Sequence, residues 1–219
     1  MMKLAVFDWN GTLLADTLAV LDGVNHELAF INHPPITMRQ YREFYDTPLI
    51  KFMEKIGVDK ELFEAKGMGM ARAFHAYYEP RASKLRTRAG VRQTLDTLLE
   101  ADVRCIILSN HTLEGVYLQL ERLKLSKYFS EVLANEAQGM NHYQGKQERL
   151  QQYMADTNFK ASQAVIIGDT DEEVRIGRNL GLKTVSITGG HNSTRRLKQA
   201  KPDVLVSRVP DIVGNIKEL

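Results

Sequence analysis

Three short apolar runs of the chain are each followed at once by polar side chains that could act on a ligand. The runs cover residues 4–7, 106–108 and 166–167, and the polar residues behind them are Asp8, then Ser109 with Asn110, then the cluster from Asp169 to Glu173. If the runs form neighbouring parallel strands, their carboxyl ends lie side by side, where open α/β sheets bind ligands. The sequence therefore predicts one crevice that contains carboxylates, a hydroxyl and an amide.

Each cluster also has a simpler structural explanation. Asp8 could cap the following helix, Ser109 or Asn110 could be turn residues, and the acids of 169–173 suit the positive end of a helix dipole. Taken singly, these explanations suffice. Three clusters that meet in one crevice are harder to explain in this way, and we interpret them as a site.

Helices and strands alternate along the part of the chain that would position these clusters. Predicted helices cover 89–100, 113–123, 147–155, 172–180 and 194–200, and predicted strands cover 103–108, 132–134, 164–167, 184–187 and 204–206. A last helical turn covers 212–216, and residues 4–7 form a buried strand near the start. This alternation is typical of right-handed βαβ crossovers and a mostly parallel sheet covered on both faces.

Residues 17 to about 80 carry no strand signal, and their pattern is helical. Apolar residues at helical spacing follow Asp16 or Thr17 as a cap, and Thr37 with Gln40 resembles a capping box that opens a second helix. Further helices are predicted at 48–56 and 59–78, and Pro80 is expected to end the last one. We therefore predict an α/β fold, a doubly wound parallel (Rossmann-like) sheet with an inserted all-helical cap. The predicted domains are a core of 1–15 and 84–219 and a cap of 16–83.

The composition is that of an ordinary globular protein. Of the 219 residues, 43% are hydrophobic and 26% charged, and the basic residues are scattered, so we expect no nucleic-acid partner. No run approaches membrane-spanning length, and Asp8 interrupts the first apolar stretch too early for a signal peptide. The single Cys105 lies in an apolar run, which indicates a buried thiol in a reducing compartment. We expect a cytoplasmic protein without a membrane partner, as a monomer or a homodimer.

Four segments, in this order, resemble the four motifs of the haloacid dehalogenase superfamily: FDWNGTLL at 7–14, ILSN at 107–110, the lysine at position 146, and IGDTDEEV at 167–174. The helical insertion after the first motif is similar to the branch that contains phosphoglycolate phosphatase. The match extends over essentially the whole chain. The order of the motifs is specific for the superfamily, but it does not identify one substrate.

The resemblance implies a magnesium-dependent phosphatase that acts through an aspartyl-phosphate. Asp8 would be the nucleophile that attacks phosphorus. The Mg²⁺ would be held by Asp8, by the backbone carbonyl of Asn10 and by Asp169, with Glu173 as a further acid within reach of the ion or its water. Magnesium prefers a few hard oxygen ligands together with water and substrate phosphate, so this set suits it.

The same resemblance assigns the binding of the phosphoryl group to three residues. Ser109 and the backbone amide of Asn110 would bind phosphoryl oxygens, and Lys146 would neutralise charge that develops in the transition state. Lys146 follows Gly145 and lacks the proline that usually comes after this lysine in the family, which makes its assignment less specific.

Asn10 is the largest departure from the family pattern, which has a second aspartate two residues after the nucleophile. That aspartate protonates the leaving alcohol and then activates the hydrolytic water, whereas an amide cannot ionise near neutral pH. General acid–base catalysis contributes roughly 10²–10⁴-fold, so we expect its loss to slow turnover rather than abolish it.

Three explanations of Asn10 are open from the sequence alone. A neighbouring group could replace the aspartate, and His111 is the nearest candidate along the chain. The Asn10-Gly11 pair could deamidate and so restore an aspartate. Alternatively, the protein is a slow enzyme or a phosphoryl binder with another role.

We interpret the chain as a phosphatase of small phosphorylated metabolites, with phosphoglycolate-like esters as the leading substrates by analogy. The alternative is a catalytically weak phosphometabolite-binding or regulatory protein on the same fold. Arg42, Lys51, Arg86 and Arg88 could face an anionic substrate, although solvated charges are the more common role of such residues.

Overall fold

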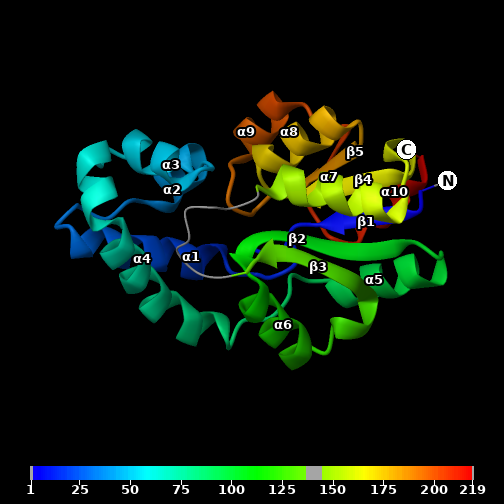
Figure 1. The fold of residues 1–219 in the computed structure, drawn as a ribbon, viewed down its shortest axis with the longest axis horizontal. Helices are drawn as coiled ribbons and strands as arrows, with labels where there is room; N and C mark the ends of the chain where they lie inside the picture. Colours follow the sequence, from blue (N-terminus) through cyan, green and yellow to red (C-terminus); the bar gives the residue numbers. More distant parts are fainter. Residues whose placement is uncertain (1, 137–144, 219) are drawn as a thin grey trace.

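A six-stranded parallel sheet forms the centre of the protein in the computed structural model, which describes residues 2–136 and 145–218 (Figure 1). The strand order is β3-β2-β1-β4-β5-β6. β1 (Leu4–Phe7) pairs with β2 (Arg104–Thr112) on one side and with β4 (Ala164–Gly168) on the other. The outer strands are β3 (Phe129–Asn135), β5 (Lys183–Ile187) and β6 (Val204–Val206). This order places the carboxyl ends of β2, β1 and β4 next to one another.

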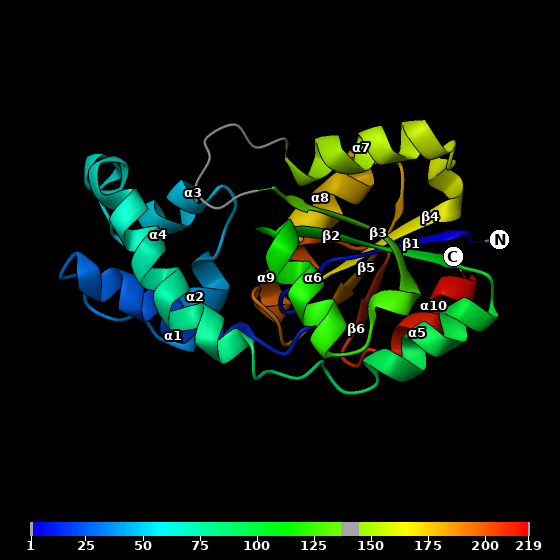
Figure 2. The ribbon, with the colours of Figure 1, turned by 60° about the horizontal axis from the view of Figure 1, so that its bottom comes forward.

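Helices cover both faces of the sheet (Figure 2). On one face lie α5 (Val91–Glu100), α6 (Leu113–Arg122) and α10 (Asp211–Glu218), and on the other lie α7 (Lys146–Thr157), α8 (Asp171–Leu180) and α9 (Thr194–Ala200). Short 3₁₀ turns, Ser126–Tyr128 and Ala161–Gln163, lead into β3 and β4.

Both faces of β1 are buried, because alternate residues of a strand point to opposite sides. Ala5 and Phe7 belong to the apolar cluster under α5, α6 and α10, and Leu4 and Val6 belong to the cluster under α7 and α8. A strand that is apolar at every position is what a sheet covered on both faces requires. The predicted fold class, a doubly wound parallel sheet, is confirmed.

Four helices between β1 and α5 form a group at one end of the sheet (Figure 1). They are α1 (Thr17–Phe30), α2 (Met38–Phe44), α3 (Leu49–Lys55) and α4 (Lys60–Ala82), and we call them the cap helices. The predicted capping box is present at the start of α2, where the Thr37 hydroxyl accepts from the backbone N–H of Gln40. The division into two domains with boundaries at residues 16 and 83 stays a prediction.

Two predicted element ends, at residues 78 and 108, are wrong by four residues each. Helix α4 continues through Pro80 to Ala82, because a proline in the last turn removes only one backbone hydrogen bond while the Ser83 N–H still donates to the Glu79 carbonyl at 3.0 Å. Strand β2 runs past residue 108 to Thr112, which pairs with Asn135 of β3 after a register shift. Among the described residues, no helix combines the length and the apolar character needed to cross a bilayer.

A buried acid of the cap helices makes stability depend on pH. Glu27 of α1 is 2% exposed, and burial raises the pKa of its carboxyl from 4.5 to about 7. A raised pKa means that the folded protein holds the proton more tightly than the unfolded chain. The contribution of this carboxyl to stability is therefore fully present below pH 4.5 and is lost as the pH rises towards 7.

We expect Glu27→Gln to abolish this dependence and to stabilise the protein at pH 8 by up to about 3 kcal/mol relative to the wild type. Urea unfolding between pH 4.5 and 8 measures the effect. Glu64→Gln is the matched control, since the side chain of Glu64 is 63% exposed on α4. Equal pH profiles for the wild type and Glu27→Gln would contradict the prediction.

Candidate active site

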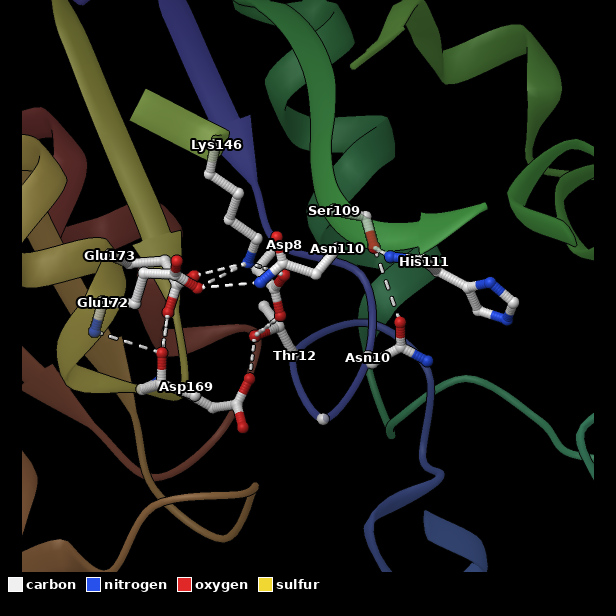
Figure 3. Close-up of polar contacts among 12 residues, drawn as sticks. Asp8, Asn10, Thr12, Ser109, Asn110, His111, Lys146, Asp169, Glu172 and Glu173 are labelled. Carbon is white, nitrogen blue, oxygen red and sulfur yellow. Dashed lines mark hydrogen bonds and ion pairs between the residues drawn. The ribbon is translucent and has the colours of Figure 1, made fainter. Parts of the chain in front are cut away.

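The end of β1 and the first turns of α7 and α8 bring three charged side chains together (Figure 3). The Lys146 ammonium, on the first residue of α7, donates to Asp8 Oδ1 at 2.7 Å and to Glu173 Oε1 at 2.7 Å. Each of the three side chains is at least nine-tenths buried. Lys146 therefore bridges the predicted nucleophile and the last acid of the fourth motif.

A threonine of the first motif connects the Asp8 carboxylate to that of Asp169. The Thr12 hydroxyl lies 2.6 Å from Asp169 Oδ1 and 3.2 Å from Asp8 Oδ2. The other oxygen of Asp169 accepts the backbone N–H of His191 at 2.5 Å. One hydroxyl therefore contacts both carboxylates. Their closeness is what the parallel order of the neighbouring strands predicts.

The electrostatics of this cluster are dominated by burial. Burial raises the pKa of Asp8 well above its ordinary value, Lys146 opposes this shift, and the charges of Glu173 and Asp169 add to it. Burial also disfavours the Lys146 ammonium, but the charges of Asp8, Glu173 and Glu172 outweigh it and raise the pKa of Lys146. The site therefore holds more acids than its lysine can neutralise.

Glu173 has a structural role that the sequence did not predict. Its Oε2 accepts from the Thr170 hydroxyl at 2.5 Å and the Thr170 N–H at 3.2 Å, which makes a capping box at the start of α8. Burial works to raise the pKa of Glu173, but its ion pair with Lys146 and the Thr170 bonds lower it overall. Both oxygens of Glu173 have partners, so its predicted role as a magnesium ligand would require an exchange of one of them.

The predicted phosphoryl-binding residues lie at the end of β2. Ser109 is buried, and its hydroxyl accepts from the His111 N–H at 3.1 Å and lies 3.5 Å from Asn10 Oδ1. Asn110 is exposed, and its side chain donates to Glu172 Oε2 at 3.0 Å. Their binding of phosphate stays a prediction.

His111 is turned away from the predicted nucleophile, and Figure 3 shows its ring pointing away from Asp8. Its Nε2 lies 3.7 Å from Glu79 Oε1 of α4, and its Nδ1 accepts the Thr112 N–H at 2.6 Å. Burial lowers the pKa of His111 below its ordinary value. These contacts favour a role at the boundary with the cap helices over replacement of the missing aspartate.

Deamidation of Asn10 is disfavoured by the hydrogen bonds around it. Cyclisation would require the Gly11 nitrogen to attack the Asn10 side-chain carbonyl. The Gly11 N–H donates to Asp16 Oδ1 at 2.7 Å, and the Asn10 Nδ2 donates to Asp16 Oδ2 at 2.6 Å. One buried carboxylate therefore holds both groups that would have to react.

The family model of the haloacid dehalogenase-like hydrolases matches residues 5–187, which include Asp8, Ser109, Lys146 and Asp169. The chain belongs to this family. Its predicted membership of the superfamily, and with it the class of hydrolase enzyme, is confirmed.

Relatives of this haloacid dehalogenase-like chain cover nearly its whole length at low identity. A phosphoglycolate phosphatase of Vibrio parahaemolyticus is 23% identical over 97% of this chain and 95% of its own length. A pyrophosphatase, PpaX, of Anoxybacillus flavithermus is 22% identical over 95% of this chain and 94% of its own length. The crystal structure of a predicted phosphatase from Clostridium acetobutylicum superposes on this chain with a TM-score of 0.84 at 21% identity. The superposition covers the full length of both chains. The last comparison supports the fold alone, and the relatives agree with the predicted resemblance to the phosphoglycolate phosphatase branch.

The residues of this haloacid dehalogenase-like site fit a magnesium ion by their chemistry. Asp8 and Asp169 offer hard oxygens, and the surplus of buried negative charge around Lys146 would be offset by a divalent cation. Within residues 2–136 and 145–218, no three side chains of His, Cys, Asp or Glu are grouped to hold a metal. Magnesium is commonly held by one or two carboxylates with water and substrate phosphate, so the set agrees with this metal.

The cap helices of this haloacid dehalogenase-like fold dock on the loop between β5 and α9. Arg42 of α2 donates to the carbonyls of Gly189 and Gly190 at 2.8 and 2.9 Å, and the Tyr41 hydroxyl lies 2.8 Å from His191 Nδ1. Arg88 donates to the carbonyls of Gly11 and Thr188. Arg42 and Arg88 are therefore engaged by backbone carbonyls and not free to bind an anionic substrate in this arrangement.

Sequence reasoning missed several residues around the site. Thr12 belongs to the first motif, and its place in the NGT segment is a signal that could indicate its role. Tyr78 and His191 reach the site from distant parts of the chain, and no spacing along the sequence indicates them.

Proposed function

We propose that the protein is a magnesium-dependent phosphatase that hydrolyses small phosphate monoesters through an aspartyl-phosphate on Asp8. The observation that carries the proposal is the buried contact of Asp8 with Lys146 beside Asp169, at the carboxyl ends of adjacent strands. A carboxylate nucleophile next to a cation is the arrangement that phosphoryl transfer requires.

The chain's own residues divide the reaction between them. The Asp8 carboxylate attacks phosphorus while the bond to the leaving oxygen breaks, and this oxygen takes a proton from solvent; water then displaces phosphate from Asp8 and gives its proton to solvent. Lys146 opposes the rise in the pKa of Asp8 that burial causes, and it would contact the charge of the phosphoryl group. Ser109 and Asn110 would bind phosphoryl oxygens. Magnesium held by Asp8, Asp169 and the Asn10 carbonyl would neutralise part of the charge on the phosphate.

Phosphoglycolate-like esters are the leading substrates, because the relatives named above include a phosphoglycolate phosphatase. Pyrophosphate is a second candidate, since another relative is named a pyrophosphatase. A small phosphorylated metabolite as the only partner, a monomer or a homodimer, and a cytoplasmic location stay predictions.

The alternative function, a catalytically weak binder of phosphorylated metabolites, is favoured by one observation. Residue 10 is an amide whose nitrogen is committed to Asp16 and Tyr78. It cannot exchange a proton with a leaving group or with water.

Phosphate release distinguishes the two functions. An aryl phosphate, phosphoglycolate and pyrophosphate would be supplied with and without magnesium. Release that requires both the metal and Asp8 supports the phosphatase. Thermal stabilisation by the same compounds without any release supports the binder. If the compounds cause neither phosphate release nor thermal stabilisation, both functions are refuted.

A further inference from the structure

The side chain of Asn10 has different surroundings at its two ends. Its Nδ2 donates to Asp16 Oδ2 at 2.6 Å and to the Tyr78 hydroxyl at 2.9 Å. Its Oδ1 lies 3.5 Å from the Ser109 hydroxyl, and Figure 3 shows it pointing towards this serine. Asp16 is fully buried and Tyr78 is 2% exposed, so solvent does not compete for these contacts.

The orientation of this amide is fixed by what its neighbours can accept or donate. The Asp16 carboxylate only accepts, and it also receives the Gly11 N–H and the Tyr78 hydroxyl, at 2.7 Å each. Tyr78 uses its one hydroxyl hydrogen on Asp16 and can therefore only accept from Asn10. A flipped amide would place its carbonyl oxygen against a carboxylate oxygen. The NH₂ group must face Asp16, and the carbonyl oxygen must face Ser109.

The same geometry would place an aspartate at position 10 against Asp16. A carboxylate at position 10 would lie against the buried carboxylate of Asp16, and like charges at hydrogen-bond distance cannot both ionise without cost. An amide at one position and a carboxylate at the other satisfy each other. Asn10 and Asp16 are a matched pair.

From these contacts we infer that Asp16 and Tyr78 are positioning residues that act through Asn10. They hold its carbonyl oxygen towards the predicted phosphoryl site, so that residue 10 is only a hydrogen-bond acceptor there. The catalytic consequence of this inference rests on the proposed function. Asn10 can orient the hydrolytic water but cannot take its proton, so with a leaving group that needs no proton the aspartyl-phosphate forms faster than it is hydrolysed.

With an aryl phosphate, formation of the aspartyl-phosphate and its hydrolysis can be measured as two separate steps. In the first step the bond from an Asp8 oxygen to phosphorus forms, and the bond from phosphorus to the aryl oxygen breaks. The aryl oxide leaves with its electron pair and needs no proton from the protein. In the second step the oxygen of water bonds to phosphorus, the bond to Asp8 breaks, and the proton of the water passes to solvent. The wild type should release a burst of aryl alcohol equal to the protein concentration and then turn over slowly.

The test exchanges the members of the pair. Asn10→Asp/Asp16→Asn keeps the composition and restores one amide facing one carboxylate. Asn10→Asp/Asp22→Asn is its matched control, because it has the same composition but removes an exposed carboxylate of α1 that lies away from the pair. The Asn10→Asp single variant completes the set.

Thermal unfolding of the metal-free proteins at pH 7 tests the pairing without using activity. We expect Asn10→Asp and the Asp22 control to unfold several degrees below the wild type, and the exchanged variant to recover most of that loss. Equal midpoints for the exchanged variant and its control would overturn the inference.

Burst kinetics test the catalytic consequence. The exchanged variant should raise the steady rate by about 10²–10⁴-fold over the wild type with the burst lost, while the control stays slow. A control as fast as the exchanged variant would overturn the inference. If the midpoints follow the expected pattern and no variant releases aryl alcohol, the positioning of Asn10 stands and the proposed function fails.

Discussion

Replacing Asp8 with asparagine is expected to abolish phosphate release and, at the same time, to stabilise the metal-free protein at pH 7. The loss of release should be on the order of 10⁴-fold or more, because the remaining groups can bind the ester but cannot form the covalent intermediate. The gain in stability follows from charge. Burial, with Glu173 and Asp169, raises the pKa of Asp8, so its ionised form opposes folding.

The stabilising effect of Asp8→Asn should grow as the pH rises. The Asp8 carboxyl has a folded pKa above its unfolded value, so its contribution to stability is present at low pH and is lost as the pH rises. The unfolding midpoint of Asp8→Asn should therefore be higher than that of the wild type at pH 8. At pH 5 the two midpoints should differ less. Lys146 keeps its contact with Glu173 at 2.7 Å in this variant.

Urea unfolding at the two pH values, with the Asp22→Asn variant as an exposed control, measures this effect beside phosphate release. A fall in stability at pH 8 would mean that the ion pair with Lys146 outweighs the cost of burying Asp8. Undiminished release would exclude Asp8 as the nucleophile.

The sheet and the approach of the strand ends were predictable because their signals are local. Residues 4–7 are apolar at every position, as a strand buried on both faces must be, and the helices and strands that follow alternate at short spacing. The Thr37–Gln40 capping box was likewise readable within four residues. Parallel pairing of β1 with β2 and β4 then sets Asp8 beside Ser109 and Asp169.

The environment of Asn10 was not predictable, because it depends on partners that are distant in sequence. Tyr78 lies 68 residues from Asn10 and reaches it only through the packing of α4 against α1. Asp16 is close in sequence, but it reads as a helix cap, and the structure shows no side-chain cap bond from it. Its carboxylate binds Asn10 and Gly11 instead.

The geometry also changes the interpretation of Asn10→Asp. From the sequence, this substitution restores the family's missing aspartate. In the structure it adds a second carboxylate next to Asp16, so the single variant tests charge crowding as well as catalysis. Only the exchange of both residues separates the two effects.

Replacing Lys146 with methionine is expected to have the largest effect on stability. It removes the cation that joins Asp8 to Glu173 and leaves buried carboxylates without compensation, which typically costs about 3–5 kcal/mol. Phosphate release should fall by about 10²–10³-fold, the usual cost of losing one group that stabilises transition-state charge. Lys66→Met, on an exposed position of α4, is the matched control for the substitution itself.

Loss of the Lys146 charge also changes the electrostatics of Glu173. Without Lys146, the pKa of Glu173 should rise, since the ion pair with Lys146 is the main influence that lowers it against burial. The loss of stability should therefore be larger at pH 8 than at pH 5, where the acids can take up protons. In Lys146→Met/Glu173→Gln, one acid is neutralised together with the lysine, so part of the stability should return while release stays low. A double variant no more stable than Lys146→Met would mean that the lysine acts through packing of its aliphatic chain rather than through its charge.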